Sequence, residues 1–264
     1  MPAPSPAAPF EVIAPEAAGM PLYRVVKRSL LNAIESGSYP PGQALPSETE
    51  IAVAMGVSIG TLRRAVDELA AEQILVRRQG RGTFVATQHT DRFLFQFFRV
   101  EREDGLREAP TIDVLSFERT RVDAEAAHAL DLRVGEPVIR IENRLLLQGS
   151  AVIFDQITLP ASLFKGLTER RFRERPGTIY QLYQVDFGIT VLNARERARA
   201  GVADRNTVRV LGIAPGEPVM QVRRTALSFG DKPVEYRLST IDTAHHDYVN
   251  LLSRQSGPAA TSHD

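Results

Sequence analysis

The stretch that decides the fold runs from Leu45 to Ala86 and reads LPSETEIAVAMGVSIGTLRRAVDELAAEQILVRRQGRGTFVA. Near its start, Ser47 is followed three residues later by Glu50, the pattern of a capping box. In that arrangement the serine hydroxyl accepts the N3 amide and the glutamate reaches back to the cap amide. We therefore predict a helix that begins at Glu48. Gly56 is expected to end it, because glycine tolerates the left-handed conformation common at helix C-termini.

A second helix is predicted after only a turn, with Ser58 as its N-cap and Val57 placed to pack against Leu62. At about 100° per residue, one face of this helix is apolar and consists of Leu62, Ala65, Val66 and Leu69. The opposite side carries Gly60, Arg64 and Asp67, with Arg63 on the flank. The apolar face is expected to pack inward, which leaves the other face free to enter a groove.

A short basic hairpin follows the second helix. Its strands are predicted at Leu75 to Arg78 and at Thr83 to Ala86, on either side of the turn Gln79-Gly80-Arg81-Gly82. Glycine lets the turn backbone approach another chain closely, and the arginines add positive charge. Two capped helices and a basic hairpin in this order are typical of a winged helix-turn-helix, whose second helix reads duplex DNA.

The predicted DNA contacts are the polar and small residues of both helix starts and of the hairpin tip. They are Ser47, Thr49, Ser58, Gly60, Thr61, Arg63, Arg64, Gln79, Gly80, Arg81 and Gly82. Arginine can hold guanine through two hydrogen bonds, and serine and threonine can bond to bases or phosphate. Any one of these arginines could equally be a solvated surface charge, but the ordered set is far more specific.

Residues 21–86 resemble the DNA-binding domain of the GntR family of bacterial transcription regulators. The matching segments are Pro21-Leu22-Tyr23, Ile34-Glu35-Ser36-Gly37, Pro41-Gly42, Leu45-Pro46-Ser47-Glu48, Gly56-Val57-Ser58, Thr61-Leu62-Arg63 and Gly80-Arg81-Gly82-Thr83-Phe84-Val85. Ile59 departs from the family, which usually has arginine directly after the serine of the second cap. The resemblance implies DNA binding, and the departure implies an operator that differs from the usual one.

Composition narrows the class of protein. A chain of 264 residues with 43% hydrophobic residues suits two folded domains. The absence of cysteine excludes disulfides, thiolate zinc sites and thiol nucleophiles. The net charge is zero, but residues 20–88 hold eight Lys or Arg and six Asp or Glu, a local charge of +2. No apolar run approaches a membrane span, and the N-terminus lacks a basic signal-peptide region, so we expect a cytoplasmic bacterial protein.

The rest of the chain is organised by an internal repeat. Residues 130–139 (LDLRVGEPVI) recur 81 residues later at 211–220 (LGIAPGEPVM). Each copy is predicted to form a short helix, a Gly-Glu-Pro turn and two strands. The predicted strands are 138–147, 151–158, 220–229 and 234–241, with an edge strand at 113–122, a helix at 177–187 and another strand at 190–198. The fold class is therefore α+β, with an antiparallel sheet covered by helices.

This second part resembles the UTRA domain, the effector-binding module of HutC-type GntR regulators, which is similar in fold to chorismate lyase. The resemblance covers about residues 92–252. It implies a small-molecule effector and, commonly, a homodimer. The predicted domains are a disordered arm at 1–19, the winged helix-turn-helix at 20–88, a linker at 89–105, the UTRA-like domain at 106–252 and a disordered tail at 253–264.

The linker is too apolar for a free tether. Phe93, Phe95 and Phe97 alternate as in a strand that packs on the effector domain, with Phe98 turned the other way. The simpler interpretation is plain core. The alternative is an aromatic strip that docks the DNA-binding heads and repacks when ligand binds.

The predicted effector contacts are charged and polar residues of the repeated strands, namely Arg140, Arg144, Asp155, Arg224, Glu235, Tyr236 and Arg237. Guanidinium suits carboxylate or phosphate, although a surface salt-bridge ladder is an equally good interpretation of any one residue. Family members that bind sugar phosphates often carry Arg-x-Arg about ten residues before an acidic residue. In this chain Asn143 and Leu145 occupy the positions of the two arginines ahead of Asp155, so the pattern is absent. Its absence favours another small, carboxylate-bearing metabolite over a sugar phosphate.

No cofactor is predicted. Asp242, His245, His246 and Asp247 lie close in sequence, but adjacent histidines on a strand point to opposite faces, so a metal site is disfavoured. The leading hypothesis is a ligand-responsive repressor that binds a palindromic double-stranded operator as a dimer. The alternatives are a constitutive DNA-binding dimer and an enzyme with a lyase-like fold. No nucleophile and base could be paired in the sequence, and fold alone does not establish chemistry.

Overall fold

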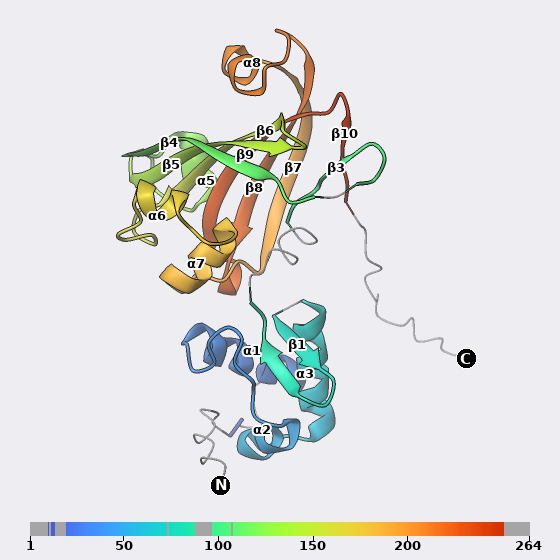
Figure 1. The fold of residues 1–264 in the computed structure, drawn as a ribbon. Coiled ribbons are helices and arrows are strands. Elements are labelled where there is room, and N and C mark those ends of the chain that lie inside the picture. The colour runs from blue at the N-terminus through green and yellow to red at the C-terminus, as the bar shows by residue number, and fades with distance from the viewer. Residues whose placement is uncertain are drawn as a thin grey trace, which may run out of the picture.

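The computed structural model describes residues 10, 12–13, 20–72, 74–87, 97–106 and 108–250. Figure 1 shows an N-terminal head at one end of a larger sheet domain. The elements of the head are α1 (Leu22–Glu35), α2 (Glu48–Met55), α3 (Ile59–Ala71), β1 (Leu75–Arg78) and β2 (Gly82–Val85). The strands β1 and β2 form an antiparallel hairpin. The predicted winged helix-turn-helix is confirmed.

The caps of the head follow the predicted pattern. The Ser47 hydroxyl accepts the Glu50 amide at 3.3 Å, and the Ser47 amide donates to the Glu50 carboxylate at 2.8 Å. Gly56 ends α2 in the left-handed region with φ of 66°. The Ser58 hydroxyl accepts the Thr61 amide at 3.1 Å at the start of α3. Because these caps satisfy amides that have no partner within the helix, they fix where each helix begins.

The apolar face of α3 forms the centre of the head. Leu62, Ala65, Val66 and Leu69 are all buried, as predicted. They pack against α1 and α2 in one cluster with Leu30, Ile51 and Met55. Full burial of an aliphatic side chain of this size stabilises a fold by about 1.5–3 kcal/mol, so this core holds the two helices in a fixed geometry.

One six-stranded antiparallel sheet organises the second domain. The chain runs through β4 (Thr111–Arg121), α5 (Ala124–Ala129), β5 (Pro137–Leu147), β6 (Ser150–Pro160), α6 (Glu169–Arg173), α7 (Ile179–Phe187), β7 (Asn193–Val202), α8 (Arg205–Leu211), β8 (Pro218–Leu227), the 3-10 turn η1 (Phe229–Asp231) and β9 (Pro233–Asp242). The strand order is β4-β5-β6-β9-β8-β7. The predicted α+β class and the edge position of the first strand are confirmed.

The duplication accounts for this order. Each copy contributes an outer strand, a short helix and a hairpin, and the innermost strands β6 and β9 pair at the centre. Asp123 caps α5 and Asp204 caps α8, 81 residues apart, in the same way. Helix α5 packs near Tyr236 of β9, whereas α8 packs near Phe154 of β6. Each helix therefore covers a strand of the other copy, which ties the copies into one domain.

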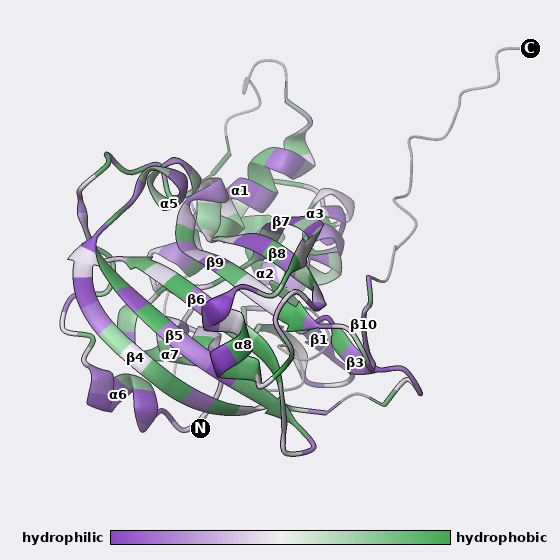
Figure 2. Ribbon diagram, turned by 90° about the horizontal axis from the view of Figure 1, so that it is seen from above, coloured by the Kyte–Doolittle hydropathy of each residue, from purple (hydrophilic) through white to green (hydrophobic). Residues whose placement is uncertain are grey.

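The two faces of the sheet are covered differently. Helices α6 and α7 lie over one face, where most of the buried apolar residues gather, and α5 and α8 lie over the other. We call the first the α7 face and the second the α5 face. Figure 2 shows hydrophobic and hydrophilic residues alternating along the strands, as expected for strands that send successive side chains to opposite faces.

Several predicted ends are shifted. The helix predicted from residue 177 begins at Ile179, because the Thr178 hydroxyl caps it by accepting the Gln181 amide at 3.1 Å. The strand predicted at 220–229 ends at Leu227, since Gly230 and Asp231 both take positive φ angles and turn the chain. The strand predicted at 190–198 instead covers Asn193–Val202.

The linker enters the sheet domain beside a small separate ribbon, in which β3 (Val100–Arg102) pairs with β10 (His246–Tyr248). Phe93 and Phe95 lie outside the described residues. Phe97 and Phe98 are buried in the core of the α7 face and precede β3. None of the helices in the described ranges has both the length and the apolar character needed to cross a membrane.

Candidate functional site

The first candidate site is the outer side of α3 together with the hairpin tip. All of the predicted DNA contacts in α2, α3 and the turn are exposed, except Thr61, which is half-buried. The hydroxyls of Ser58 and Thr61 lie 2.8 Å apart, so both stand at the α3 N-terminus. Ile59 is 39% exposed beside them. The first turn of α3 therefore presents hydroxyls and the N-terminal end of the helix, as a helix that enters a groove does.

The arginines of the head are held in place before DNA arrives. Glu48 accepts from Arg63 at 2.8 Å and from Arg77 at 3.1 Å, so it joins the recognition helix to the hairpin. The guanidinium of Arg64 lies 3.9 Å from the centre of the Tyr23 ring. Exposed ion pairs contribute only about 0–1 kcal/mol, so phosphate groups can displace Glu48 at little cost. Neither the Glu48 contacts nor the stacking on Tyr23 could be predicted from the sequence pattern.

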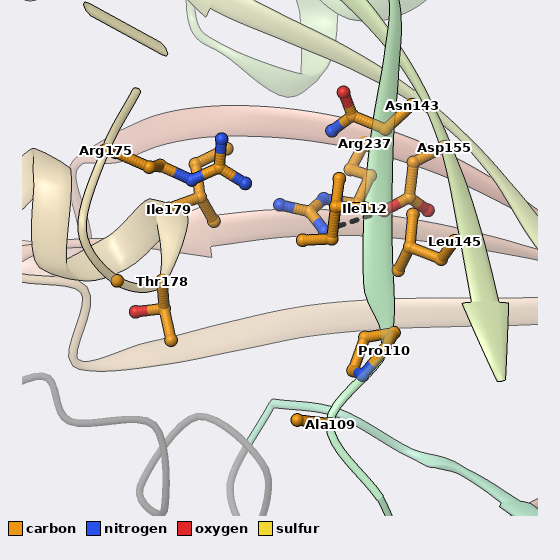
Figure 3. A pocket seen from close by; sticks show the side chains of 11 residues that line it. Ala109, Pro110, Ile112, Asn143, Leu145, Asp155, Arg175, Thr178, Ile179 and Arg237 are labelled. Atoms are coloured by element: carbon orange, nitrogen blue, oxygen red, sulfur yellow. Dashed lines mark hydrogen bonds and ion pairs between the residues drawn. The ribbon is translucent and has the colours of Figure 1, made fainter. Parts of the chain in front are cut away.

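The second candidate site is a cavity of about 160 Å³ on the α7 face. It lies between β5, β6 and β9, the segment before β4 and the loop that leads into α7. Its apolar walls are Pro110, Ile112, Leu145 and Ile179, and its polar groups are Asn143, Asp155, Arg175, Thr178 and Arg237. Figure 3 shows Arg175 approaching from the loop before α7, with Asn143 and Asp155 across the cavity from it.

A buried charge network forms the floor of this cavity. Arg237 donates to Asp155 at 2.9 Å and makes two hydrogen bonds to Glu235, at 3.0 and 3.1 Å. These three side chains are at most 5% exposed. Burial and the carboxylate of Glu235 raise the pKa of both Tyr180 and Tyr183, so their hydroxyls stay protonated and donate to Glu235 at 3.2 and 2.7 Å. The charges are paired, which such burial requires.

Two polar atoms in the cavity wall have no hydrogen-bond partner among the residues that the structure describes. Asn143 is 3% exposed, and its Oδ1 atom accepts no hydrogen bond. The Nε of Arg175 is likewise buried without an acceptor, although its Nη1 donates to the Phe172 carbonyl at 2.5 Å. Burial lowers the pKa of Arg175, Tyr183 opposes this shift and Arg237 adds to it. A buried polar atom without a partner costs about 1–3 kcal/mol, so each can gain from a ligand.

Residues next to this network also contact the linker between the head and the sheet domain. Arg224 donates to the Phe97 carbonyl at 2.5 Å and to Glu196 at 2.6 Å. The ring of Phe97 meets Tyr180 edge to face, with 4.9 Å between ring centres. Tyr180 therefore touches both the linker and the carboxylate that holds Arg237 in the cavity floor.

The predicted effector residues divide between the two faces. Asp155, Glu235, Arg237 and Arg224 gather on the α7 face, the first three in one network. Arg140 instead pairs with Asp123 at 2.9 Å, and Arg144 with Asp113 at 2.8 Å. Tyr236 faces α5 and donates to Glu125 at 2.7 Å.

Strand alternation explains the division. Asn143 lies between Arg140 and Arg144 but shares the inward side with Ile141, and Tyr236 lies between two inward residues. Arg140 and Arg144 thus make the surface ion pairs that were the alternative interpretation. The sequence pointed to Asn143 only as a departure from Arg-x-Arg, and gave no signal for Arg175.

The acidic and histidine residues near β10 do not gather. The Asp242 carboxylate accepts the Ala244 amide at 3.0 Å, which forms a local turn. In the part of the chain that the structure describes, no three His, Asp or Glu side chains are grouped as metal ligands would be.

Comparison with known proteins matches both halves of the chain. Residues 22–85 match the bacterial regulatory proteins of the gntR family, and residues 106–247 match the UTRA domain. The histidine utilization repressor of Pseudomonas putida is 31% identical over 81% of this chain and 85% of its own length. The HTH-type transcriptional repressor NagR of Bacillus subtilis is 26% identical over 90% of this chain and 97% of its own.

A solved ligand-binding domain from Bordetella bronchiseptica, assigned to the GntR family, is 32% identical and superposes with a TM-score of 0.56. The match covers 60% of this chain and 98% of that domain. The chain therefore belongs to the GntR family of transcription regulators, in the branch whose effector-binding module is a UTRA domain.

Proposed function

We propose that this protein is a repressor that binds a palindromic operator as a homodimer and leaves it when a small effector enters the cavity on the α7 face. The observation that carries the proposal is the contact chain from the cavity to the linker, behind an exposed recognition helix. The names of the P. putida and B. subtilis relatives, both repressors, support the sign of regulation.

The head supplies the DNA contacts. The first turn of α3 enters the major groove, where Arg63 and Arg64 reach base edges or phosphates. The hairpin tip, with Gly80 and Arg81, follows the adjacent sugar-phosphate backbone. Two heads of one dimer then read half-sites that lie about one helical turn apart, or a multiple of it.

The effector acts through Tyr180. A ligand that binds Arg237 changes the hydrogen bonds between Arg237 and Glu235. Tyr180 also donates to Glu235, so its position changes with them. Tyr180 packs on Phe97, the described residue nearest to the head in the linker. A second contact joins the domains, because Phe229 of η1 belongs to the apolar cluster of the head. A ligand that favours one packing of these contacts shifts the dimer between two head spacings. Such coupling is typically about 1–3 kcal/mol.

Binding, not turnover, is the role that the cavity favours. Asp155 and Glu235 both accept hydrogen bonds from Arg237, so each carboxylate is already engaged by a guanidinium. We therefore place the protein among regulators of the bacterial cytoplasm, where its operator DNA lies.

The test is a fluorescence anisotropy titration of a labelled palindromic duplex taken from upstream of the gene, repeated over a series of salt concentrations. We expect affinity to fall steeply with salt, because the head releases counterions from the phosphates. The variant R81A should bind more weakly on all duplexes, while R140A, on β5 of the sheet domain, is the matched control. Binding that is weak and independent of salt would reject the proposal.

A thermal-shift screen of small acids, amines and sugar phosphates separates an effector-responsive repressor from a constitutive DNA-binding dimer. A ligand at one hundred times its Kd stabilises the folded state by about 2.7 kcal/mol. A ligand found in this way should release the duplex; a stabilising ligand that leaves operator affinity unchanged favours the constitutive dimer.

A further inference from the structure

The cavity has a cationic end. Arg175 lies there beside the N-terminus of α7, whose cap Thr178 and first residue Ile179 also line the cavity. Within the described ranges no carboxylate forms an ion pair with Arg175. Its Nη1 donates to the Phe172 carbonyl, and its guanidinium lies 4.5 Å from the centre of the Phe172 ring, while its Nε has no acceptor among the described residues.

The opposite end accepts hydrogen bonds and carries negative charge. The Oδ1 of Asn143 has no donor. Asp155 receives one donor on each oxygen, from Arg237 and from Ser239, and each carboxylate oxygen can accept about two. Asp155 and Glu235 both bond the guanidinium of Arg237, so this end of the cavity holds two carboxylates on one arginine.

The repeat shows how unusual the Asn143 position is. In the second copy the residue 81 positions later is Arg224, and its guanidinium donates to Glu196 and to the Phe97 carbonyl. In the second copy a carbonyl of the linker therefore accepts from the side chain at this position, whereas in the first copy the same position faces the cavity. In the first copy the Oδ1 of Asn143 faces the cavity without a donor from the described residues.

We infer that the effector is a small ampholyte, with a carboxylate that pairs with Arg175 and a nitrogen donor at its other end that bonds Asn143 and Asp155. This inference rests on the proposed function, since it assigns the ligand of the same cavity. The Nε side of a guanidinium offers a fork that matches the two oxygens of a carboxylate. A phosphate dianion would meet only one arginine without an ion-pair partner among the described residues, and would add negative charge near the carboxylates of Asp155 and Glu235.

The volume of the cavity limits the size of the ligand. About 160 Å³ between Ile112, Leu145 and Ile179 is close to the volume of an engineered protein cavity that admits benzene. Because Arg175, Asn143 and Asp155 line the same volume, the ligand is expected to be compact, with one ring or a short aliphatic chain between its two ends.

The experiment uses the full chain and two matched sets of probes. The ampholytes are 4-(aminomethyl)benzoate and the straight-chain ω-amino acids. The single-ended probes are benzoate, benzylamine and phenyl phosphate. Thermal shift gives binding, and operator anisotropy gives release. We expect the ampholytes as a class to bind at least tenfold more tightly than every single-ended probe, and to release the operator.

Variants assign each end of the ligand. R175Q should weaken ampholyte binding by roughly 10- to 100-fold, because it removes a charge-assisted pair, and should leave benzylamine unchanged. N143L should weaken ampholytes by about tenfold and leave benzoate unchanged, whereas N143D, which keeps an acceptor, should bind ampholytes at least as well as the unaltered protein. R140Q, on the other face of the sheet, is the matched control and should change neither. Melting of each variant without ligand reports any loss of folding separately.

Two results would overturn the inference. One is tighter binding of phenyl phosphate or benzoate than of any ampholyte; the other is the absence of stabilisation by every ampholyte. Neither result touches the proposed function, which stands or falls with salt-dependent operator binding and is measured on the same samples.

Discussion

Arg237 offers the sharpest test of the buried network, through the substitution R237M. Methionine matches much of the arginine stem in volume but has no charge. It would leave the carboxylates of Glu235 and Asp155, at 0% and 2% exposure, facing each other without a cation. The hydroxyls of Tyr180 and Tyr183 would remain as the only donors to Glu235 among its hydrogen bonds described above.

The expected loss follows from this burial. Removing one partner of a buried ion pair costs about 3–5 kcal/mol, because the other partner stays buried and unpaired. For a domain of this size, each kcal/mol lowers the Tm by roughly 2–4 °C, so R237M should lower the Tm by about 6–20 °C. Protein stability is typically only about 5–15 kcal/mol, so a large share of the total is involved.

Tyrosine fluorescence follows the melting of the sheet domain. The chain has no tryptophan, and four of its six tyrosines, Tyr180, Tyr183, Tyr236 and Tyr248, lie in that domain. The matched control is R140M, since Arg140 pairs with Asp123 at the surface of the same sheet, with side chains 31% and 56% exposed. Such a pair contributes about 0–1 kcal/mol, so R140M should lower the Tm by no more than about 4 °C.

A third variant separates charge from packing. Adding E235Q to R237M replaces one stranded carboxylate by a neutral amide, so part of the lost Tm should return. Equal Tm values for R237M and R140M would refute the reasoning, because they would mean that the network is hydrated in solution.

Three further predictions concern single positions. I59R places a cation at the exposed start of α3 and should tighten operator binding and steepen its dependence on the logarithm of salt concentration by about one unit, as one added phosphate contact would; an unchanged slope in an anisotropy series would contradict this. Y180L removes the edge-to-face contact with Phe97 and should leave operator affinity without effector unchanged while reducing effector-driven release by roughly 2- to 30-fold; full release would exclude this route. For Glu196, burial raises the pKa, but Arg224, Tyr248 and Arg99 together lower it more, so the net pKa is below 4.5 and its stabilisation is present above that pH; the Tm difference between the unaltered protein and E196Q should shrink as pH falls below about 4.5, and a constant difference would argue against the pair.

The caps and the sheet order could be predicted because their determinants are local or repeated. Ser47 and Glu50 meet within one helical turn, and so do Ser58 and Thr61, so the chain itself fixes their geometry. The duplication allowed both hairpins to be predicted in one sheet, since the two copies share one pattern of inward and outward side chains.

The cavity could be predicted only in part. Alternation puts Arg140 and Arg144 on one face and Asn143 on the other, but it does not say which face the helices cover with a cavity. Arg175 follows a run of exposed arginines in α6, and only the turn through Pro176 and Gly177 brings it over the sheet. That placement depends on contacts between segments distant in sequence, for which a single sequence has no periodic signal.

The most direct test of the central claim measures operator release and cavity binding in one sample. The full chain is bound to its labelled palindromic duplex at fixed salt and titrated with a compound that stabilises it in the thermal-shift screen, in parallel with the variant R175Q. The duplex should dissociate from the unaltered protein, and R175Q should bind the duplex equally well but require roughly 10- to 100-fold more compound for release. Release at the same concentration from both proteins would contradict the account, because the effector would then act from somewhere other than this cavity.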